Sequence, residues 1–318
     1  MLKHHPVLLN EVLNCLRPGD KKIYVDATFG TGGYTKAILK KADCKVIAID
    51  QDIKSKKYVD EINVFWPGKV DFYHNNFKNI DSIVRQKVDA IVADCGISTT
   101  QLLDVNRGFS FQYDAPLDMR IDRDNNIKQA KHIVNFFNEE KLADLIYQYS
   151  QERYSRRIAK FIVKERKIKN IITTQHLAKI VHTAIGLKKI GKINSATKTF
   201  QALRIAVNSE LECLSEMLMK SINLLKSGGK LIVVTFHSLE DKIVKDFFKN
   251  HSYKRVAMSK YSNDQKKSSV YNKVNTLNKK NIAFDIIEKK PIVPSDQEIK
   301  LNPNSRSSKL RFGIKIEN

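Results

Sequence analysis

Acidic residues and glycines follow predicted strands in the first hundred residues of this 318-residue chain. The densest group is Asp26-Ala27-Thr28-Phe29-Gly30-Thr31-Gly32-Gly33, and Asp50 and Asp94 end two later strands. Glycine turns the backbone with positive φ or lets it approach a ligand closely. The carboxyl ends of parallel strands form a crevice where ligands bind. The spacing therefore predicts a cofactor site that contains three carboxylates.

The charges at this site favour S-adenosylmethionine over a dinucleotide. A dinucleotide requires G-x-G-x-x-G without a nearby acid, because its pyrophosphate lies on a helix N-terminus. Here the spacing is G-x-G-G and Asp26 precedes it. The ammonium and sulfonium groups of S-adenosylmethionine are attracted by acids, and Asp50 is suited to its ribose hydroxyls. The alternative is structural: the glycines make a tight turn, Asp26 caps the loop and Asp50 caps a helix.

The elements that position these residues alternate between strands and helices. Predicted strands cover Ile23–Asp26, Lys45–Asp50, Val70–His74 and Val88–Asp94, with a helix over residues 34–41. Such near-continuous apolar strands predict a parallel sheet covered on both faces.

Helical periodicity replaces this pattern in residues 104–210, and strands return at residues 231–236, 282–287 and 310–316. We therefore predict a core formed by residues 1–103 and 211–318, with a helical subdomain, 104–210, inserted into it. Gly228 and Gly229 are predicted to cap the helix over residues 208–225. The lysine-rich stretch 253–280 is predicted to be a surface loop.

The composition favours a polyanionic partner. Lys and Arg number 56 against 34 Asp and Glu, a net charge of +22, although such an excess also serves solubility alone. The helical segment carries a basic series: Arg153, Arg156, Arg157, Lys160, Lys164, Arg166, Lys167 and Lys169. This series is either a surface for an RNA backbone or an ordinary solvated face.

Other classes of protein are disfavoured. No apolar run approaches the roughly 20 residues of a membrane helix, and no secretory signal is apparent, so we expect a cytosolic protein. The four cysteines and eight histidines show no metal-ligand spacing, so no metal is expected.

Longer strings along the chain share one family pattern. They are His5–Val12, Asp26–Tyr34, Arg107–Phe111, Ala115–Arg120, Thr199–Leu211, Phe236–Asp241 and Arg306–Arg311. In this order they closely resemble the bacterial 16S rRNA cytosine-N4 methyltransferase family, also called MraW or RsmH. The resemblance spans nearly the whole chain.

The resemblance implies an α/β fold of the class I, Rossmann-like methyltransferase type, with a mostly parallel seven-stranded sheet and the inserted helices recognising substrate. It implies methylation of a decoding-site cytidine in 16S rRNA of the small ribosomal subunit. It places cofactor contacts at Gly32, Gly33, Tyr34, Asp50, Phe77, Asp94 and Gln101, beside Asp26 and Gly30 of the same loop. Tyr34 stands where the family usually has His, and Lys198 where Arg is common. Whether the chain forms a homodimer is left open.

Methylation of cytosine N4 requires a hydrogen-bond acceptor for the exocyclic amine and a flipped-out base. Asp94 is the candidate acceptor, with contact to the cofactor alone as the alternative. His237 is a second candidate catalytic residue and Phe236 could stack on the base, or it belongs to the core. Arg107, Arg120, Arg204 and Arg306 are candidate phosphate contacts, with a surface or salt-bridged position as the alternative for each.

Three rival functions stay open on sequence grounds. They are a methyltransferase with a DNA or protein substrate, an NAD-dependent oxidoreductase, and a ribosome-assembly factor with a decayed catalytic site.

Overall fold

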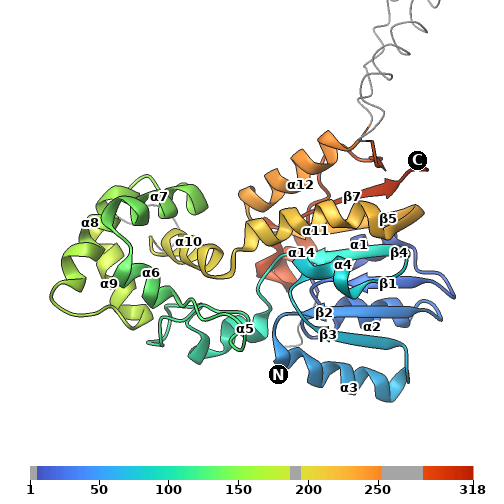
Figure 1. Ribbon diagram of the computed structural model, residues 1–318, viewed down its shortest axis with the longest axis horizontal. Helices are drawn as coiled ribbons and strands as arrows, with labels where there is room; N and C mark the ends of the chain where they lie inside the picture. The colour runs from blue at the N-terminus through green and yellow to red at the C-terminus, as the bar shows by residue number, and fades with distance from the viewer. Residues whose placement is uncertain (1–5, 187–194, 253–281, 318) are drawn as a thin grey trace, which may run out of the picture. The chain divides into compact units, whose positions relative to one another are not determined.

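A computed structural model describes residues 6–186, 195–252 and 282–317 (Figure 1). The chain forms two compact units. The first contains Met1–Asp50, Ser55–Gly96 and Leu214–Asn318, and the second contains Gln51–Lys54 and Ile97–Cys213.

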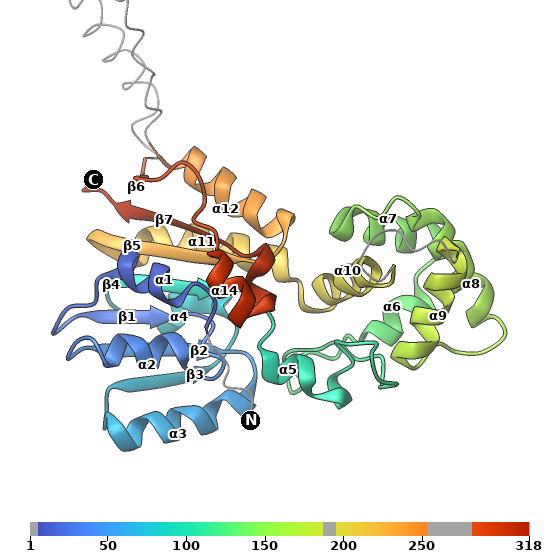
Figure 2. The ribbon, with the colours of Figure 1, turned by 180° about the vertical axis from the view of Figure 1, so that it is seen from behind.

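The first unit is built on a seven-stranded sheet, seen from two sides in Figures 1 and 2. Its strand order is β3 (Val70–His74), β2 (Lys45–Asp50), β1 (Ile23–Asp26), β4 (Val88–Asp94), β5 (Leu225–Thr235), β7 (Lys309–Lys315), β6 (Phe284–Asp285). The first five strands run parallel, and β7 is antiparallel to both of its neighbours. The predicted α/β class and the mostly parallel seven-stranded sheet are confirmed.

Helices cover both faces of this sheet because alternate strand residues point to opposite sides. In β4, Ala90 and Val92 pack with helices α1 (Leu9–Leu16), α2 (Gly33–Leu39) and α3 (Lys56–Phe65). The intervening Ile91 and Ala93 pack with α4 (Ile80–Ile83), α11 (Glu210–Leu224) and α12 (Ser238–Asn250). All four β4 side chains are fully buried. This double covering explains why the strand reads as an unbroken apolar run.

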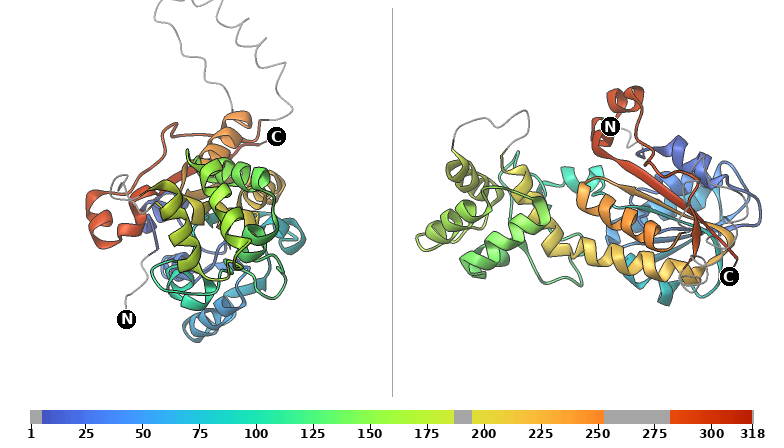
Figure 3. Two further views of the ribbon diagram at one scale, coloured as in Figure 1. Left: turned by 90° about the vertical axis from the view of Figure 1, so that its left-hand side faces the viewer. Right: turned by 90° about the horizontal axis from the view of Figure 1, so that it is seen from above.

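The second unit is helical (green to yellow in Figure 3). It contains α5 (Thr99–Leu103), α6 (Ala130–Phe136), α7 (Glu139–Ser150), α8 (Ser155–Arg166), α9 (Thr174–Ile185) and α10 (Thr197–Asn208). Helix α7 packs against α8 and α10, and α8 packs against α9. Buried pairs four residues apart, such as Leu142 with Ile146, give each of the helices α6 to α10 one apolar face toward a shared core.

Two predictions about organisation need correction. The second unit starts at Ile97 and ends at Cys213, and it also takes Gln51–Lys54, whereas the sequence assigned it 104–210. Asp52 and Lys54 make polar contacts with residues of α5 and of the turn after it. A segment of only four residues between a strand and a helix has no periodicity from which its assignment to the second unit could be predicted.

The predicted helix cap at Gly228 and Gly229 is also wrong. Helix α11 ends at Leu224, and both glycines lie inside β5. The β4–β5 register shifts there, since Val88 pairs with Leu225 but Ala90 pairs with Lys230. The positive φ of 74° at Gly228 belongs to this bulge. The predicted loop 253–280 lies outside the described residues, and the strand expected at 282–287 is limited to β6.

Candidate active site

Three predicted site acids lie at one edge of the sheet of the first unit. Asp26, Asp50 and Asp94 are the last residues of the adjacent parallel strands β1, β2 and β4. The loop after β1 is tied to both neighbours: the Asp94 N–H donates to Thr28 Oγ1 at 2.6 Å, and the Phe29 N–H donates to the Ile49 carbonyl at 3.0 Å. The sheet register therefore fixes the loop and the acids as one group.

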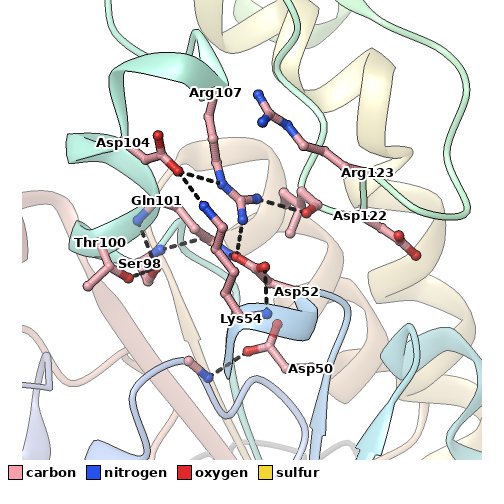
Figure 4. Close-up of polar contacts among 12 residues, drawn as sticks. Asp50, Asp52, Lys54, Ser98, Thr100, Gln101, Asp104, Arg107, Asp122 and Arg123 are labelled. Carbon is pink, nitrogen blue, oxygen red and sulfur yellow. Dashed lines mark hydrogen bonds and ion pairs between the residues drawn. The ribbon is translucent and has the colours of Figure 1, made fainter. Parts of the chain in front are cut away.

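Asp50 holds the glycine loop directly. Its Oδ2 accepts a hydrogen bond from the Gly30 N–H at 2.6 Å, and the side chain is largely buried (Figure 4). Gly30 has a φ of 55° and Gly32 a φ of 75°, in the left-handed region that favours glycine. The predicted turn is present, and Asp50 is part of its support.

The protein's own side chains fill the space left by two of the glycines. A Cβ on Gly33 would lie 2.2 Å from Cγ of Pro6, and one on Gly32 would lie 2.6 Å from Cδ1 of Ile62. Both glycines are thus required for packing of the loop against its neighbours, whatever the ligand. Their backbone amides open α2, in the position predicted for a cofactor loop.

The electrostatics of the site are dominated by two acids removed from water. Burial raises the pKa of Asp26 to about 6, although its Oδ2 accepts a hydrogen bond from the Thr35 hydroxyl at 2.7 Å. Burial, with the charges of Asp26 and Glu240, raises the pKa of Asp94 to about 7. Both values lie far above the ordinary 3.8 of an aspartate.

Tyr34 connects Asp94 to the segment before α1. Its phenol donates a short hydrogen bond to the Val7 carbonyl and lies 3.4 Å from Asp94 Oδ2. The ring is buried, and burial together with the charge of Asp94 holds the pKa of the phenol well above its usual value. The Tyr34 side chain is therefore committed to protein partners, so any cofactor contact falls to its backbone.

These residues fit the group that the sequence predicted. Asp26 Oδ1 and Asp94 Oδ1 are buried and have no hydrogen-bond partner among the residues that the structure describes. An orphaned carboxylate oxygen is costly unless a donor or cation joins it. The ammonium and sulfonium of S-adenosylmethionine supply such a cation, whereas a pyrophosphate would be repelled.

The remaining predicted cofactor residues have different settings. Phe77 begins the short helix η2 (Phe77–Asn79) after β3 and packs at the margin of the core of the first unit. Gln101 belongs to the second unit, in α5, where it is largely buried. Its Nε2 donates to Asp52 Oδ2 at 3.0 Å, and its Oε1 accepts from the Ser98 N–H at 3.1 Å (Figure 4).

His237 has a structural task. It caps α12, where its Nδ1 accepts from the Glu240 N–H at 3.4 Å, while Glu240 Oε2 accepts from the Phe236 N–H at 2.8 Å. The His237 Nε2 lies 3.1 Å from Glu240 Oε1. The neighbouring Phe236 packs on Gly96, where a Cβ would lie 2.6 Å from the ring. Phe236 is therefore a half-buried residue that packs against the core of the first unit.

Three of the four arginines predicted to contact phosphates are engaged in ion pairs. Arg107 is 2% exposed and pairs with Asp52 at 2.6 Å. Arg120 pairs with both oxygens of Asp118 and Arg204 with both oxygens of Glu210, at 2.7–3.0 Å. These pairs match the salt-bridged alternative; Arg107 is buried in its pair, whereas Arg120 and Arg204 are partly exposed and their contact with phosphates stays a prediction. Arg306 is exposed.

The basic series on α8 faces solvent for the most part. Arg153, Arg156, Arg157, Lys160, Lys164, Lys167 and Lys169 are exposed. Arg166 is the exception, since it is half-buried and donates to the Val134 carbonyl at 2.7 Å. The series thus forms a basic face on and beside α8, suited to a phosphate backbone.

Sequence reasoning missed two residues of this site. Thr35 holds Asp26, and Glu240, only 1% exposed, raises the pKa of Asp94. The spacing His237-x-x-Glu240 matches a capping box, which could have revealed the buried glutamate. Thr35 offered no comparable signal.

Within the described ranges, no helix combines the length and apolar character needed to cross a membrane.

Comparison with known proteins places this geometry in context. The model of the MraW methylase family matches residues 1–316. The Ribosomal RNA small subunit methyltransferase H of Ehrlichia canis is 47% identical over 317 residues, covering 98% of this chain and 100% of that protein. The protein of the same name from Rickettsia akari is 46% identical, with 98% of each chain covered. The solved structure of an rRNA methylase from Streptococcus thermophilus has a TM-score of 0.40 at 12% identity, covering 97% of this chain and 96% of that one.

Proposed function

The chain belongs to the MraW methylase family, and from this premise we propose that it methylates N4 of a decoding-site cytidine in 16S rRNA of the small ribosomal subunit. The relatives named above carry the name of a small-subunit rRNA methyltransferase and match along their whole length. Family membership confirms a methyltransferase with S-adenosylmethionine as cofactor and leaves no place for an NAD-dependent oxidoreductase.

The observation that carries the proposal is the carboxylate of Asp94 at the end of β4, whose Oδ1 is buried and has no hydrogen-bond partner among the residues that the structure describes. When bound, S-adenosylmethionine supplies an electrophilic methyl group. The amino group of cytosine is a poor nucleophile, because its lone pair is conjugated with the ring. A carboxylate acceptor orients the N4 hydrogens and takes the proton that N4 loses. We assign this role to Asp94, which Tyr34 orients.

The predicted cofactor residues then have distinct tasks. Asp26 and Asp94 neutralise the positive charge of the cofactor, Asp50 binds the ribose hydroxyls, and the amides of Gly30, Gly32, Gly33 and Tyr34 line the loop. Phe77 and Gln101 complete the cofactor contacts. His237 is proposed to meet the cytosine through its imidazole edge, in addition to capping α12.

The helical unit is proposed to recognise the substrate. Its basic face on and beside α8 carries seven exposed cations, which neutralise RNA phosphates and release condensed counterions. An rRNA substrate in the small subunit also leads us to propose a cytoplasmic location.

One assay tests the target atom. The purified chain is incubated with methyl-labelled S-adenosylmethionine and small subunits that lack the modification, and the rRNA is digested to nucleosides. Label in N4-methylated cytidine is the expected result. Label in another nucleoside would overturn the target atom, and binding of the cofactor without any label would favour the role in ribosome assembly.

The role of Asp94 has its own test. Asp94→Asn keeps the size and removes the charge, so we expect the single-turnover rate at saturating cofactor to fall by about 10²–10⁴-fold, the usual contribution of general acid–base catalysis. If only the cofactor affinity falls while single-turnover chemistry is unchanged, Asp94 is a cofactor contact and not the acceptor.

A further inference from the structure

A buried charge network in the second unit takes no part in the chemistry described so far (Figure 4). At its centre Arg107 Nη2 lies 2.6 Å from Asp52 Oδ2, and the two side chains are 3% and 7% exposed. The guanidinium also donates to the Ile121 carbonyl at 2.9 Å and lies 3.5 Å from Asp104 Oδ2. With these partners Arg107 is an internal residue of this unit.

Asp52 distributes this anchorage over its own segment. Its Oδ1 accepts from the Lys54 N–H at 3.1 Å, which closes a local turn. The Lys54 ammonium in turn binds Asp104 at 2.8 Å. Asp52 and Lys54 thus both bind the turn that contains Asp104 and Arg107. These two contacts fix the four-residue segment Gln51–Lys54 to that turn.

The same carboxylate oxygen of Asp52 fixes Gln101. Asp52 Oδ2 accepts from the Gln101 amide at 3.0 Å as well as from Arg107. On the other side of the amide, Gln101 and Ser98 form a reciprocal capping box at the start of α5. The orientation of the Gln101 side chain is therefore defined by two opposed partners.

The anchored segment follows Asp50 without any intervening residue. The second unit begins at Gln51, so Asp52 lies only two residues beyond the acid that holds Gly30. Two peptide bonds limit the Cα separation to about 7 Å, so a shift at Asp52 reaches the backbone of Asp50. Asp50 and Gln101 are both predicted contacts of the cofactor.

We propose that Arg107 and Asp52 are positioning residues for cofactor binding, because their ion pair holds both the segment after Asp50 and the amide of Gln101. The inference rests on the proposed function insofar as Asp50 and Gln101 contact the cofactor. A buried ion pair adds little net stability compared with apolar packing, and its retention is better explained by the geometry that it specifies.

Titration of the full-length chain with S-adenosylhomocysteine tests this, by calorimetry at a temperature where every variant is folded. We expect Arg107→Met to weaken binding at least tenfold and Asp52→Asn at least threefold. The double variant should bind no more weakly than Arg107→Met, since each substitution breaks the same link. We expect the affinity of the variants for 5′-methylthioadenosine, which lacks the amino-acid group, to fall by the same factor, because Asp50 is proposed to bind the ribose.

The matched control is Arg204→Met. It removes a partly buried bidentate pair of the same unit, which Arg204 forms with Glu210. We expect its binding to change less than twofold. Unchanged binding in Arg107→Met, or an equal loss in Arg204→Met, would overturn the inference. If Arg107→Met does not fold, Asp52→Asn is the test. A loss of affinity for S-adenosylhomocysteine smaller than threefold in Asp52→Asn would then overturn the inference.

Failure of the proposed function gives different results. A wild-type chain that binds S-adenosylhomocysteine but forms no N4-methylated cytidine refutes the target atom and leaves the positioning roles standing. If Asp50→Ala and Gln101→Ala both bind normally, the cofactor contacts are wrong and the inference falls with them.

Discussion

Asp26 and Asp94 work against the stability of the folded chain at neutral pH. Their folded-state pKa values of about 6 and about 7 exceed the ordinary 3.8, so the folded chain holds their protons more tightly than the unfolded chain does. The stability linked to these protons is fully present below about pH 4 and is lost as the pH rises through 6 and 7. A cationic cofactor would reverse this cost by pairing with the carboxylates.

This linkage predicts the pH dependence of thermal stability. Asp94→Asn cannot ionise, so its melting temperature relative to wild type should rise between pH 5 and pH 8. Scanning calorimetry of both chains without cofactor measures the difference. Parallel curves for the two proteins would show that Asp94 titrates normally. A saturating cofactor should narrow the difference, because it stabilises the carboxylate of the wild-type chain.

Tyr34 illustrates a side chain whose role follows from its partners. Tyr34→Phe keeps the ring but leaves the buried Val7 carbonyl without its donor. We expect a decrease of about 1–3 kcal/mol in the free energy of unfolding, the cost of an unsatisfied buried group. Urea denaturation measures this. Since the backbone amide is retained, cofactor affinity should fall far less than stability, and a decrease confined to affinity would contradict the assignment.

At the scale of elements, His237 has two roles that substitutions can separate: it caps helix α12, and it is proposed to contact the cytosine. Asparagine caps helices well but has no imidazole, whereas alanine neither caps nor titrates. If His237 meets the cytosine, both His237→Asn and His237→Ala should lower turnover, and only the alanine variant should also lose about 1 kcal/mol of stability. Single-turnover rates and urea denaturation separate the two effects. Full activity of His237→Asn would leave capping as the sole role.

Helix α8 and the residues after it carry the prediction for RNA. Changing Lys160, Lys164 and Lys167 to Gln should weaken binding of the rRNA substrate. The slope of log affinity against log salt should become shallower by about 0.7–0.9 for each RNA phosphate that the variant no longer neutralises. The matched control changes three exposed lysines of α12, which are Lys242, Lys245 and Lys249. An equal effect of both triple variants would indicate non-specific charge rather than a surface on α8.

Strands β1, β2 and β4 were predictable from sequence because each is largely apolar and mostly buried, whereas the edge strand β3 is buried only at Val70. β1 to β4 have the predicted bounds. The bulge in β5 was not predictable, since Gly228 and Gly229 follow a helix and resemble its cap. They lie between Leu225, which pairs with Val88, and Lys230, which pairs with Ala90, and both partners are more than a hundred residues away in the sequence.

At the scale of the whole molecule, the acids of the site were predictable because strand ends align in a parallel sheet. Partners that are remote in sequence were not. Arg107 looks like a surface cation in its own segment, and only the fold brings it to Asp52, 55 residues away. A charge pattern therefore does not distinguish a buried, paired arginine such as Arg107 from an exposed one.

The discontinuous division of the chain has a consequence for its synthesis. The helical unit is complete once Cys213 has been made, but the sheet still lacks β5, β7 and β6, which all follow that residue. Domains generally fold as units while the chain is being made. The helical unit in the middle of the chain is therefore completed before the sheet unit that begins the chain, and the strand that ends in Asp94 has one unpaired edge until β5 emerges from the ribosome. An exposed strand edge of this kind is a site for aggregation, so synthesis of this protein passes through a stage at which protection by a chaperone would matter most.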